Sequence, residues 1–230
     1  MTDMLAPGTC VHGWKVIRHL REGRHGAFYA VERDGQPFVL KWLGSSQKSG
    51  FFEPPEVLAE REVTCLKLLR GPHVAALEAQ GRWPEEEGGS FLVLQAVEGM
   101  TLTQWYHQYG PTARDMLHVF LGITSALCEM HRKGVRYPSI SSGDITVRKG
   151  RLESVLTDIG GAFPGWGALT SDEIGEDLHA VGVMLYQALT RKNPGPYAPP
   201  PHVVNPRVPR ELSEVAMRLL APGPTPISWM

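Results

Sequence analysis

Apolar and polar positions alternate over the first part of the chain, between Gly13 and Leu43. Three apolar stretches, at residues 16–20, 27–31 and 38–43, are separated by polar or glycine-containing segments. Asp34-Gly35, between the last two stretches, is a strong signal for a tight hairpin turn. This part of the sequence therefore predicts a set of antiparallel strands.

The spacing then becomes helical. Residues 53–70 carry apolar positions at intervals of three and four, and Gly71-Pro72 ends this predicted amphipathic helix. Residues 91–97 return to the character of a strand. The chain up to about residue 97 thus reads as a small, strand-rich part with one main helix.

After Gly99 the pattern is mainly helical. Thr112 and Asp115 have the spacing of a capping box at the start of a long helix. A proline-rich stretch at residues 194–209 is interpreted as a rigid connector. Helices are predicted over residues 112–134, 174–188 and 210–220. This order of elements implies two lobes with a cleft between them.

Composition narrows the classes of function. The 230 residues are ample for a core, and 23 Lys and Arg against 24 Asp and Glu give no basic field that would attract nucleic acid or an anionic membrane. The longest apolar stretch, 116–130, is too short to span a bilayer. Three separate cysteines and an N-terminus without a signal-peptide pattern favour a reducing, cytoplasmic location.

Several short motifs with functional residue types follow one another along the first part of the chain. Gly23 and Gly26 lie in a turn between two predicted strands, and alternation places Val39 and Lys41 on one face of a later strand. Glu62 lies at the margin of the apolar face of the helix that follows. In this order the motifs resemble those of a protein kinase domain, particularly the bacterial serine/threonine type, over nearly the whole chain.

The resemblance implies an α+β, two-lobed protein kinase-like fold. Residues 1–230 are expected to form a single kinase-like domain. Its N-lobe, residues 13–97, has an antiparallel sheet and one main helix, and its C-lobe, residues 98–230, is a truncated helical lobe.

The resemblance also implies a site for ATP or ADP with Mg²⁺ in the cleft between the lobes, and a Lys41–Glu62 ion pair beside it. The loop departs from the family pattern, because Arg21 replaces the first glycine and Phe28 replaces a valine. Leu94 falls at the gatekeeper position. The residues expected to bind nucleotide are Gly23, Gly26, Phe28, Val39, Lys41, Glu62, Leu94, Gln95, Val97 and Thr146, and those expected to hold metal are Asp144 and Asp158.

The catalytic loop is degenerate. Residues 137–144 align with the family pattern H-R-D-x-K-x-x-N, so that Ser139 replaces the catalytic aspartate and Ser141 the lysine, while Asp144 replaces the metal-binding asparagine. A serine has no carboxylate to accept the proton of a substrate hydroxyl. Only a short segment without an A-P-E motif separates Asp158 from Asp177, the residue that braces the catalytic loop in the family. No catalytic residue is therefore expected.

Three hypotheses remain. The first is a pseudokinase that regulates or scaffolds a protein partner, such as an active kinase or a signalling protein, with nucleotide as a ligand of the cleft. The second is an active transferase that uses ATP and Mg²⁺ by a non-standard mechanism. The third is a purely structural interaction module. A variant of the first leaves nucleotide out, with Lys41, Glu62 and Asp158 surviving only as a buried polar network.

Overall fold

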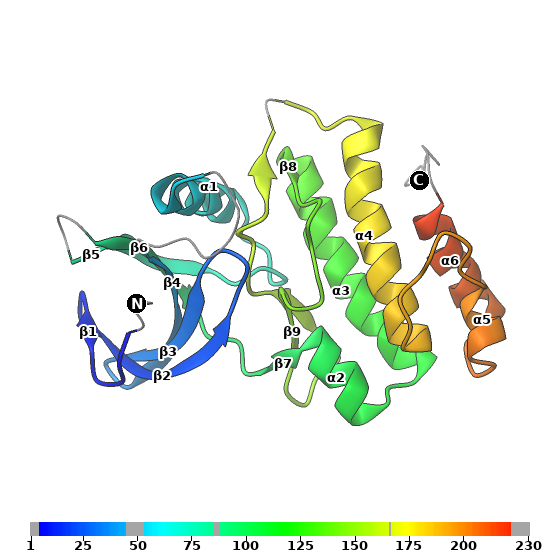
Figure 1. Ribbon diagram of the computed structural model, residues 1–230, viewed down its shortest axis with the longest axis horizontal. Coiled ribbons are helices and arrows are strands. Elements are labelled where there is room, and N and C mark those ends of the chain that lie inside the picture. The colour runs from blue at the N-terminus through cyan, green and yellow to red at the C-terminus, as the bar shows by residue number, and fades with distance from the viewer. Residues whose placement is uncertain (1–4, 45–52, 85–87, 166, 222–230) are drawn as a thin grey trace.

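The computed structural model describes residues 5–44, 53–84, 88–165 and 167–221. A strand-rich lobe and a helical lobe lie side by side (Figure 1). The first lobe has a six-stranded antiparallel sheet in the order β1-β2-β3-β4-β6-β5. Its strands are β1 (Cys10–Val11), β2 (Trp14–Glu22), β3 (Ala27–Arg33), β4 (Gln36–Gly44), β5 (Leu77–Trp83) and β6 (Gly89–Gln95).

The turn between β3 and β4 confirms the hairpin predicted from the sequence. Asp34 and Gly35 both have positive φ, 53° and 73°. A two-residue turn needs this left-handed backbone to match the twist of its strands, and Asp-Gly adopts it readily. The turn fixes the register of β4 against β3, and with it the face on which each side chain of β4 lies.

The two faces of the sheet are buried in different ways. Helix α1 (Pro55–Leu68) packs against one face and joins the main core, which continues into the helical lobe. The opposite face carries a second core, rich in aromatic residues. Its buried members are Leu5, Val11, Trp14, Val16, Ala27, Tyr29, Val31, Leu40, Trp42, Phe91 and Val93. Lys41 lies between Leu40 and Trp42 on β4, so alternation directs it toward α1.

The helical lobe confirms the three helices predicted after Gly99. Thr112 accepts a hydrogen bond from the backbone N–H of Asp115, as the capping-box spacing predicted. A short helix that the hydrophobic pattern did not reveal, α2, begins with a second capping box, between Thr101 and Gln104. The helices are α2 (Leu102–Tyr109), α3 (Ala113–Arg132), α4 (Ser171–Thr190), α5 (Pro201–Val204) and α6 (Arg210–Leu220). Of the helices described, none is long and apolar enough to cross a membrane.

Short strands in the helical lobe hold the loops that face the first lobe. Strands β7 (Gly99–Thr101), β9 (Ile145–Arg148) and β10 (Ser154–Leu156) form one sheet, and β8 (Val135–Arg136) pairs with β11 (Phe163–Pro164). Backbone hydrogen bonds from Ala75 to Leu156 and from Leu156 to His73 tie the lobes together.

Candidate functional site

A buried ion cluster lies at the junction of the two lobes. Lys41 Nζ is 2.7 Å from Glu62 Oε2 and 2.7 Å from Asp158 Oδ1. The three side chains come from β4, from α1 and from the loop after β10, and at most 3 % of any of them is exposed. The Lys41–Glu62 ion pair implied by the resemblance is therefore present, and Asp158 joins it.

Local structure holds each member of the cluster in place. Glu62 follows Leu58 and Ala59 on the buried face of α1. The loop after β10 turns so that the backbone N–H of Gly160 donates to Asp158 Oδ1 at 3.0 Å. The hydroxyl of Tyr137 donates to the carbonyl oxygen of Asp158, also at 3.0 Å. The Gly160 N–H thus orients the Asp158 carboxylate, and the Tyr137 hydroxyl holds the backbone that carries it.

The charges of the cluster are interdependent. Burial alone would lower the pKa of Lys41, but the carboxylates of Asp158 and Glu62 raise it. Burial alone would raise the pKa of Asp158, but the charge of Lys41 and the Gly160 N–H hold it below the ordinary value. Burial raises the pKa of Glu62, and Lys41 offsets this only in part. Asp158 is consequently the more firmly ionised carboxylate of the two.

The loop of residues 137–144 is braced from α4. Asp177 Oδ2 accepts a hydrogen bond from the backbone N–H of Tyr137 at 2.7 Å and lies 2.7 Å from His131 Nε2. Both contacts are buried or partly buried, and the Asp177 side chain is fully buried. This is the bracing role that the resemblance implied for Asp177.

The polar residues of that loop bond to one another. The backbone N–H and the hydroxyl of Ser141 both donate to Asp144 Oδ2, each at 2.8 Å. Burial raises the pKa of Asp144, and the nearby charge of Asp158 adds to the shift. Ser139 lies against Gly161, where a methyl group would collide with its hydroxyl. At the two positions where the family pattern has an aspartate and a lysine, the structure thus has neutral hydroxyl groups.

Some of the other residues expected to bind nucleotide lie close together, whereas others lie apart from them. Val39 and Leu94 are partners in register on β4 and β6. Thr146 lies on β9, with its hydroxyl 2.9 Å from that of Thr157. Val97 packs against the main core, whereas the side chain of Gln95 is exposed. The structure therefore pairs Val39 with Leu94 and leaves Gln95 outside the buried group.

The glycine-containing turn between β2 and β3 is tight, since the backbone N–H of Gly23 donates to the carbonyl of Gly26 at 2.7 Å. Phe28, which follows this turn, is only 2 % exposed. The guanidinium of Arg21 lies 3.9 Å from the centre of the Phe28 ring, and Lys41 Nζ lies 5.5 Å from it. His25, at the tip of the turn, is also buried.

Arg21 and His25 were not among the expected site residues. A signal for Arg21 was available in the sequence, because counting outward along a hairpin places it opposite Phe28, and the two are partners in register. Burial of His25 depends on how far the turn folds toward the other lobe, and no local sequence pattern predicts that.

The donor set suits a magnesium–phosphate group chemically. Asp144 and Asp158 offer carboxylate oxygens, the ligands that Mg²⁺ prefers, and Lys41 offers a cation for phosphate. Among the described residues no group of three or more histidine, cysteine, aspartate or glutamate side chains could hold a metal by itself. A metal held by these two carboxylates would thus need phosphate or water to complete its coordination.

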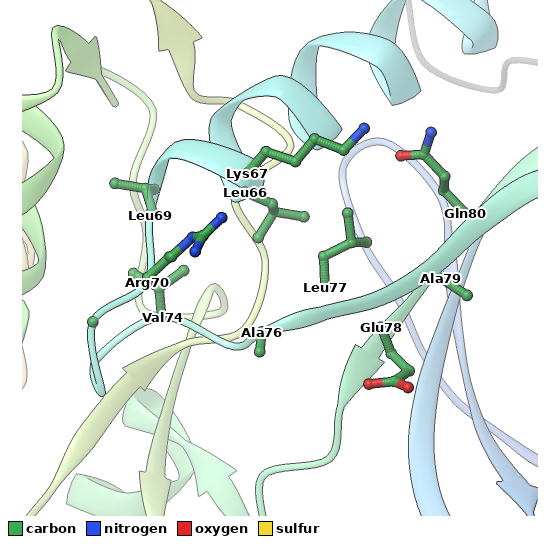
Figure 2. A pocket seen from close by; sticks show the side chains of 11 residues that line it. Leu66, Lys67, Leu69, Arg70, Val74, Ala76, Leu77, Glu78, Ala79 and Gln80 are labelled. Carbon is green, nitrogen blue, oxygen red and sulfur yellow. The ribbon is translucent and has the colours of Figure 1, made fainter.

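A separate cavity of about 610 Å³ lies on the N-lobe, between the end of α1 and β5. Figure 2 shows Leu77 pointing from the strand toward the helix, with Lys67 on the helix side. None of the site residues expected from the sequence lines this cavity. It is distinct from the ion cluster between the lobes.

The amino-acid sequence is similar to those of known proteins. No family model matches the chain. It is 23 % identical over 218 residues to the probable serine/threonine-protein kinase zyg-1 of Caenorhabditis elegans, covering 84 % of this chain and 30 % of that protein. It is 25 % identical over 215 residues to the probable serine/threonine-protein kinase pknA2 of Bifidobacterium longum, covering 82 % of this chain and 28 % of that protein. The chain therefore spans less than a third of the length of these curated relatives.

Among solved structures, the chain is similar to the kinase domain of Mycobacterium tuberculosis PknI. The TM-score is 0.74 and the sequences are 21 % identical, with 96 % of this chain and 93 % of that one covered. At this level of identity the likeness concerns the fold, and it includes both lobes.

Proposed function

Because this chain has the two-lobed fold of a protein kinase domain, we propose that it is a pseudokinase, which regulates or scaffolds a protein partner instead of transferring phosphate. The expected α+β, kinase-like fold is confirmed by the structural likeness. The observation that carries the proposal is the contrast between an intact Lys41–Glu62–Asp158 cluster and a catalytic loop whose Ser139 and Ser141 are neutral.

Phosphoryl transfer by this fold depends on positioning and on charge. A carboxylate normally accepts the proton of the substrate hydroxyl, and cations steady the moving phosphoryl group. The hydroxyl of Ser139 is too weak a base for the first role. The hydroxyl of Ser141 carries no charge and donates to Asp144 Oδ2. The loop keeps its fold while lacking both chemical functions.

The cleft retains residues that would hold ATP or ADP with Mg²⁺. Lys41 would contact the phosphates, and Asp158, with Asp144, would hold the metal. Bound nucleotide would supply charge that links the two lobes. A ligand that binds one arrangement of the lobes more tightly than another shifts the protein toward it, and so changes the surface presented to a partner. We propose an active kinase or a signalling protein as that partner.

We also propose a cytoplasmic location for the chain. Cys10, Cys65 and Cys128 are free thiols. Free cysteines of this kind are typical of a reducing compartment.

An active transferase is the second candidate, favoured by one observation. The carboxylates of Asp144 and Asp158 lie on neighbouring loops, joined by a 3.3 Å hydrogen bond from the backbone N–H of Asp158 to the carbonyl of Asp144. Two such carboxylates would suit two metal ions. The engagement of Asp144 by Ser141 argues against this reading.

Consumption of ATP separates the two candidates. We expect the wild-type protein with Mg²⁺ and ATP to consume no more ATP than the Asp158→Asn variant does, with or without a generic protein substrate. Label from the γ-phosphate should appear in neither the protein nor the substrate. Turnover by the wild type that Asp158→Asn abolishes would overturn the pseudokinase proposal in favour of the transferase.

A further inference from the structure

The glycine-containing turn lies directly against the residues that would hold phosphate. A methyl group added at Gly23 would lie 3.3 Å from Asp158 Oδ2 and 2.5 Å from Cε2 of Phe28. Because a Cα–Cβ bond is about 1.5 Å long, the Cα atom of Gly23 lies within about 5 Å of the carboxylate of the ion cluster.

That distance is too short for a bound phosphate. A phosphate oxygen needs about 2.9 Å from a backbone N–H of the turn. A Mg²⁺ ion on the far side of the phosphate needs about 2.1 Å to each of its oxygen ligands, Asp158 among them. These distances and the width of the phosphate itself exceed the gap between Gly23 and Asp158. The turn is thus closed on the phosphate subsite.

His25 fills the same region from the tip of the turn. A methyl group added at Gly160 would lie 2.5 Å from Lys41 Nζ and 3.2 Å from Cδ2 of His25. The imidazole therefore lies beside the lysine that would contact phosphate. Its burial lowers the pKa of His25 to about 4, with the charge of Lys41 adding to the shift, so the ring is neutral near pH 7.

Phe28 anchors the turn in this position. Its ring is covered by the guanidinium of Arg21 and approached by Lys41, and the edge of the ring meets Gly23. A cation stacked on the face of an aromatic ring is attracted to it, and the attraction is stronger where water is excluded, as at this buried ring. A valine, the residue that the family pattern has here, offers no such face. The two departures from the pattern, at residues 21 and 28, thus act as one contact across the hairpin.

We propose that Phe28, with Arg21 and His25, holds the glycine-containing turn closed on the phosphate subsite, so that nucleotide binds this chain only when the turn opens. The inference rests on the proposed function, since it concerns the same cleft. It makes the turn a two-state element, because only the open state is competent to bind. The apparent affinity for nucleotide is then reduced by the fraction of molecules that are open.

Calorimetric titration of Mg²⁺-ATP into the wild type and into Phe28→Val tests the inference. We expect Phe28→Val to bind Mg²⁺-ATP at least about tenfold more tightly, because the open fraction rises. Phe38→Val is the matched control, since Phe38 lies on the same sheet but packs against the second core on the opposite face. It should leave the affinity at the wild-type value.

Equal affinity of the wild type and Phe28→Val would overturn the inference. So would a double variant, Arg21→Gly with Phe28→Val, that folds but still does not bind Mg²⁺-ATP, because the turn would then not be the barrier. Neither result bears on the pseudokinase proposal, which depends on ATP consumption. Conversely, consumption of ATP by the wild type would overturn the pseudokinase proposal, but the difference in Mg²⁺-ATP affinity between the wild type and Phe28→Val would still test closure of the turn.

A second test uses only the wild-type protein, so it does not depend on whether a variant folds. We expect the imidazole of His25 in the wild-type protein, followed by NMR against pH, to titrate well below 6.5, because the closed turn keeps it beside Lys41. Titration of His25 near 6.5 would show that the ring is solvated and the turn open, and would contradict the inference.

Discussion

The function of single residues here depends on which charges are buried together. Lys41 is fully buried, and it tolerates this environment because two carboxylates lie 2.7 Å from its ammonium group. A buried charge whose partner is removed costs several kcal/mol, so the three side chains act as a unit. The resemblance implied the Lys41–Glu62 pair, and one alternative grouped Asp158 with it in a buried polar network. The sequence did not show that the glycine-containing turn lies close to Asp158.

At the same scale, His25 makes closure of the turn dependent on pH. The groups around it are Lys41, Asp158, Arg24 and Arg61. The pKa of His25 is about 4 when the closed turn buries the ring and 6.5 when the open turn exposes it to solvent. Above pH 6.5 the ring is therefore neutral in both states, and protonation does not favour the open turn. As the pH falls below 6.5, the open state takes up the proton, and the ratio of open to closed turn rises about tenfold per unit.

This pH dependence is measurable from the amide resonances of Gly23 and Gly26. Between pH 7 and pH 5 we expect them to move toward their positions in Phe28→Val, where the turn is open. The His25→Asn variant has no titrating ring and should show no such movement. Amide positions that stay constant in the wild type over this range would refute the prediction.

At the scale of elements, helix α1 is held against the helical lobe by its neighbour β11. The guanidinium of Arg61 lies 4.2 Å from the ring centre of Phe163, and that of Arg136 lies 5.6 Å from it. Arg61 Nη1 also donates to Glu53 Oε2 at 2.6 Å. The short segment after Asp158 thus contacts the helix that carries Glu62, and helps to keep the ion cluster assembled.

We expect Phe163→Ala to loosen α1. Loss of the aromatic face between two guanidinium groups should lower the free energy of unfolding by about 1–2 kcal/mol and speed amide exchange in the last turns of α1. Phe163→Leu, which keeps apolar contact but has no aromatic face, should show an intermediate effect. Unchanged exchange in α1 of Phe163→Ala would mean that β11 does not hold the helix.

Strand β5 and helix α2, which the sequence did not reveal, both give weak local signals, for different reasons. Strand β5 alternates between exposed and half-buried residues and contains Glu78, Gln80 and Arg82, so its apolar signal is weak. It is an edge strand, stabilised by its backbone pairing with β6 rather than by a buried face of its own. Helix α2 is only 8 residues long, too short for a periodic signal to stand out.

At the scale of the whole molecule, one core joins the two lobes. The same cluster of buried side chains includes Leu66 from α1, Leu94 from β6, Leu156 from β10 and Leu185 from α4. The backbone hydrogen bonds from Ala75 to Leu156 and from Leu156 to His73 cross the same boundary. The two lobes therefore share the main core, whereas the second core belongs to the sheet of the first lobe.

This continuity predicts cooperative unfolding. Heating should give a single transition, with far-ultraviolet and near-ultraviolet circular dichroism changing together, because neither lobe retains a complete core without the other. Two resolved transitions would show that the lobes unfold independently. They would also show that the junction at the ion cluster contributes little to stability.

The order of hydrophobic patterns and short motifs by itself determined the two-lobed architecture, the hairpin at Asp34-Gly35 and the substitutions at Ser139 and Ser141, because turns, helix caps and residue types are local properties. Only the tertiary structure decided which groups meet across the cleft. Gly23 lies close to Asp158 and His25 close to Gly160, each more than a hundred residues away along the chain, since closure of the turn depends on packing and charge between lobes. Contacts between residues so far apart leave no repeating pattern in the sequence from which they could be predicted.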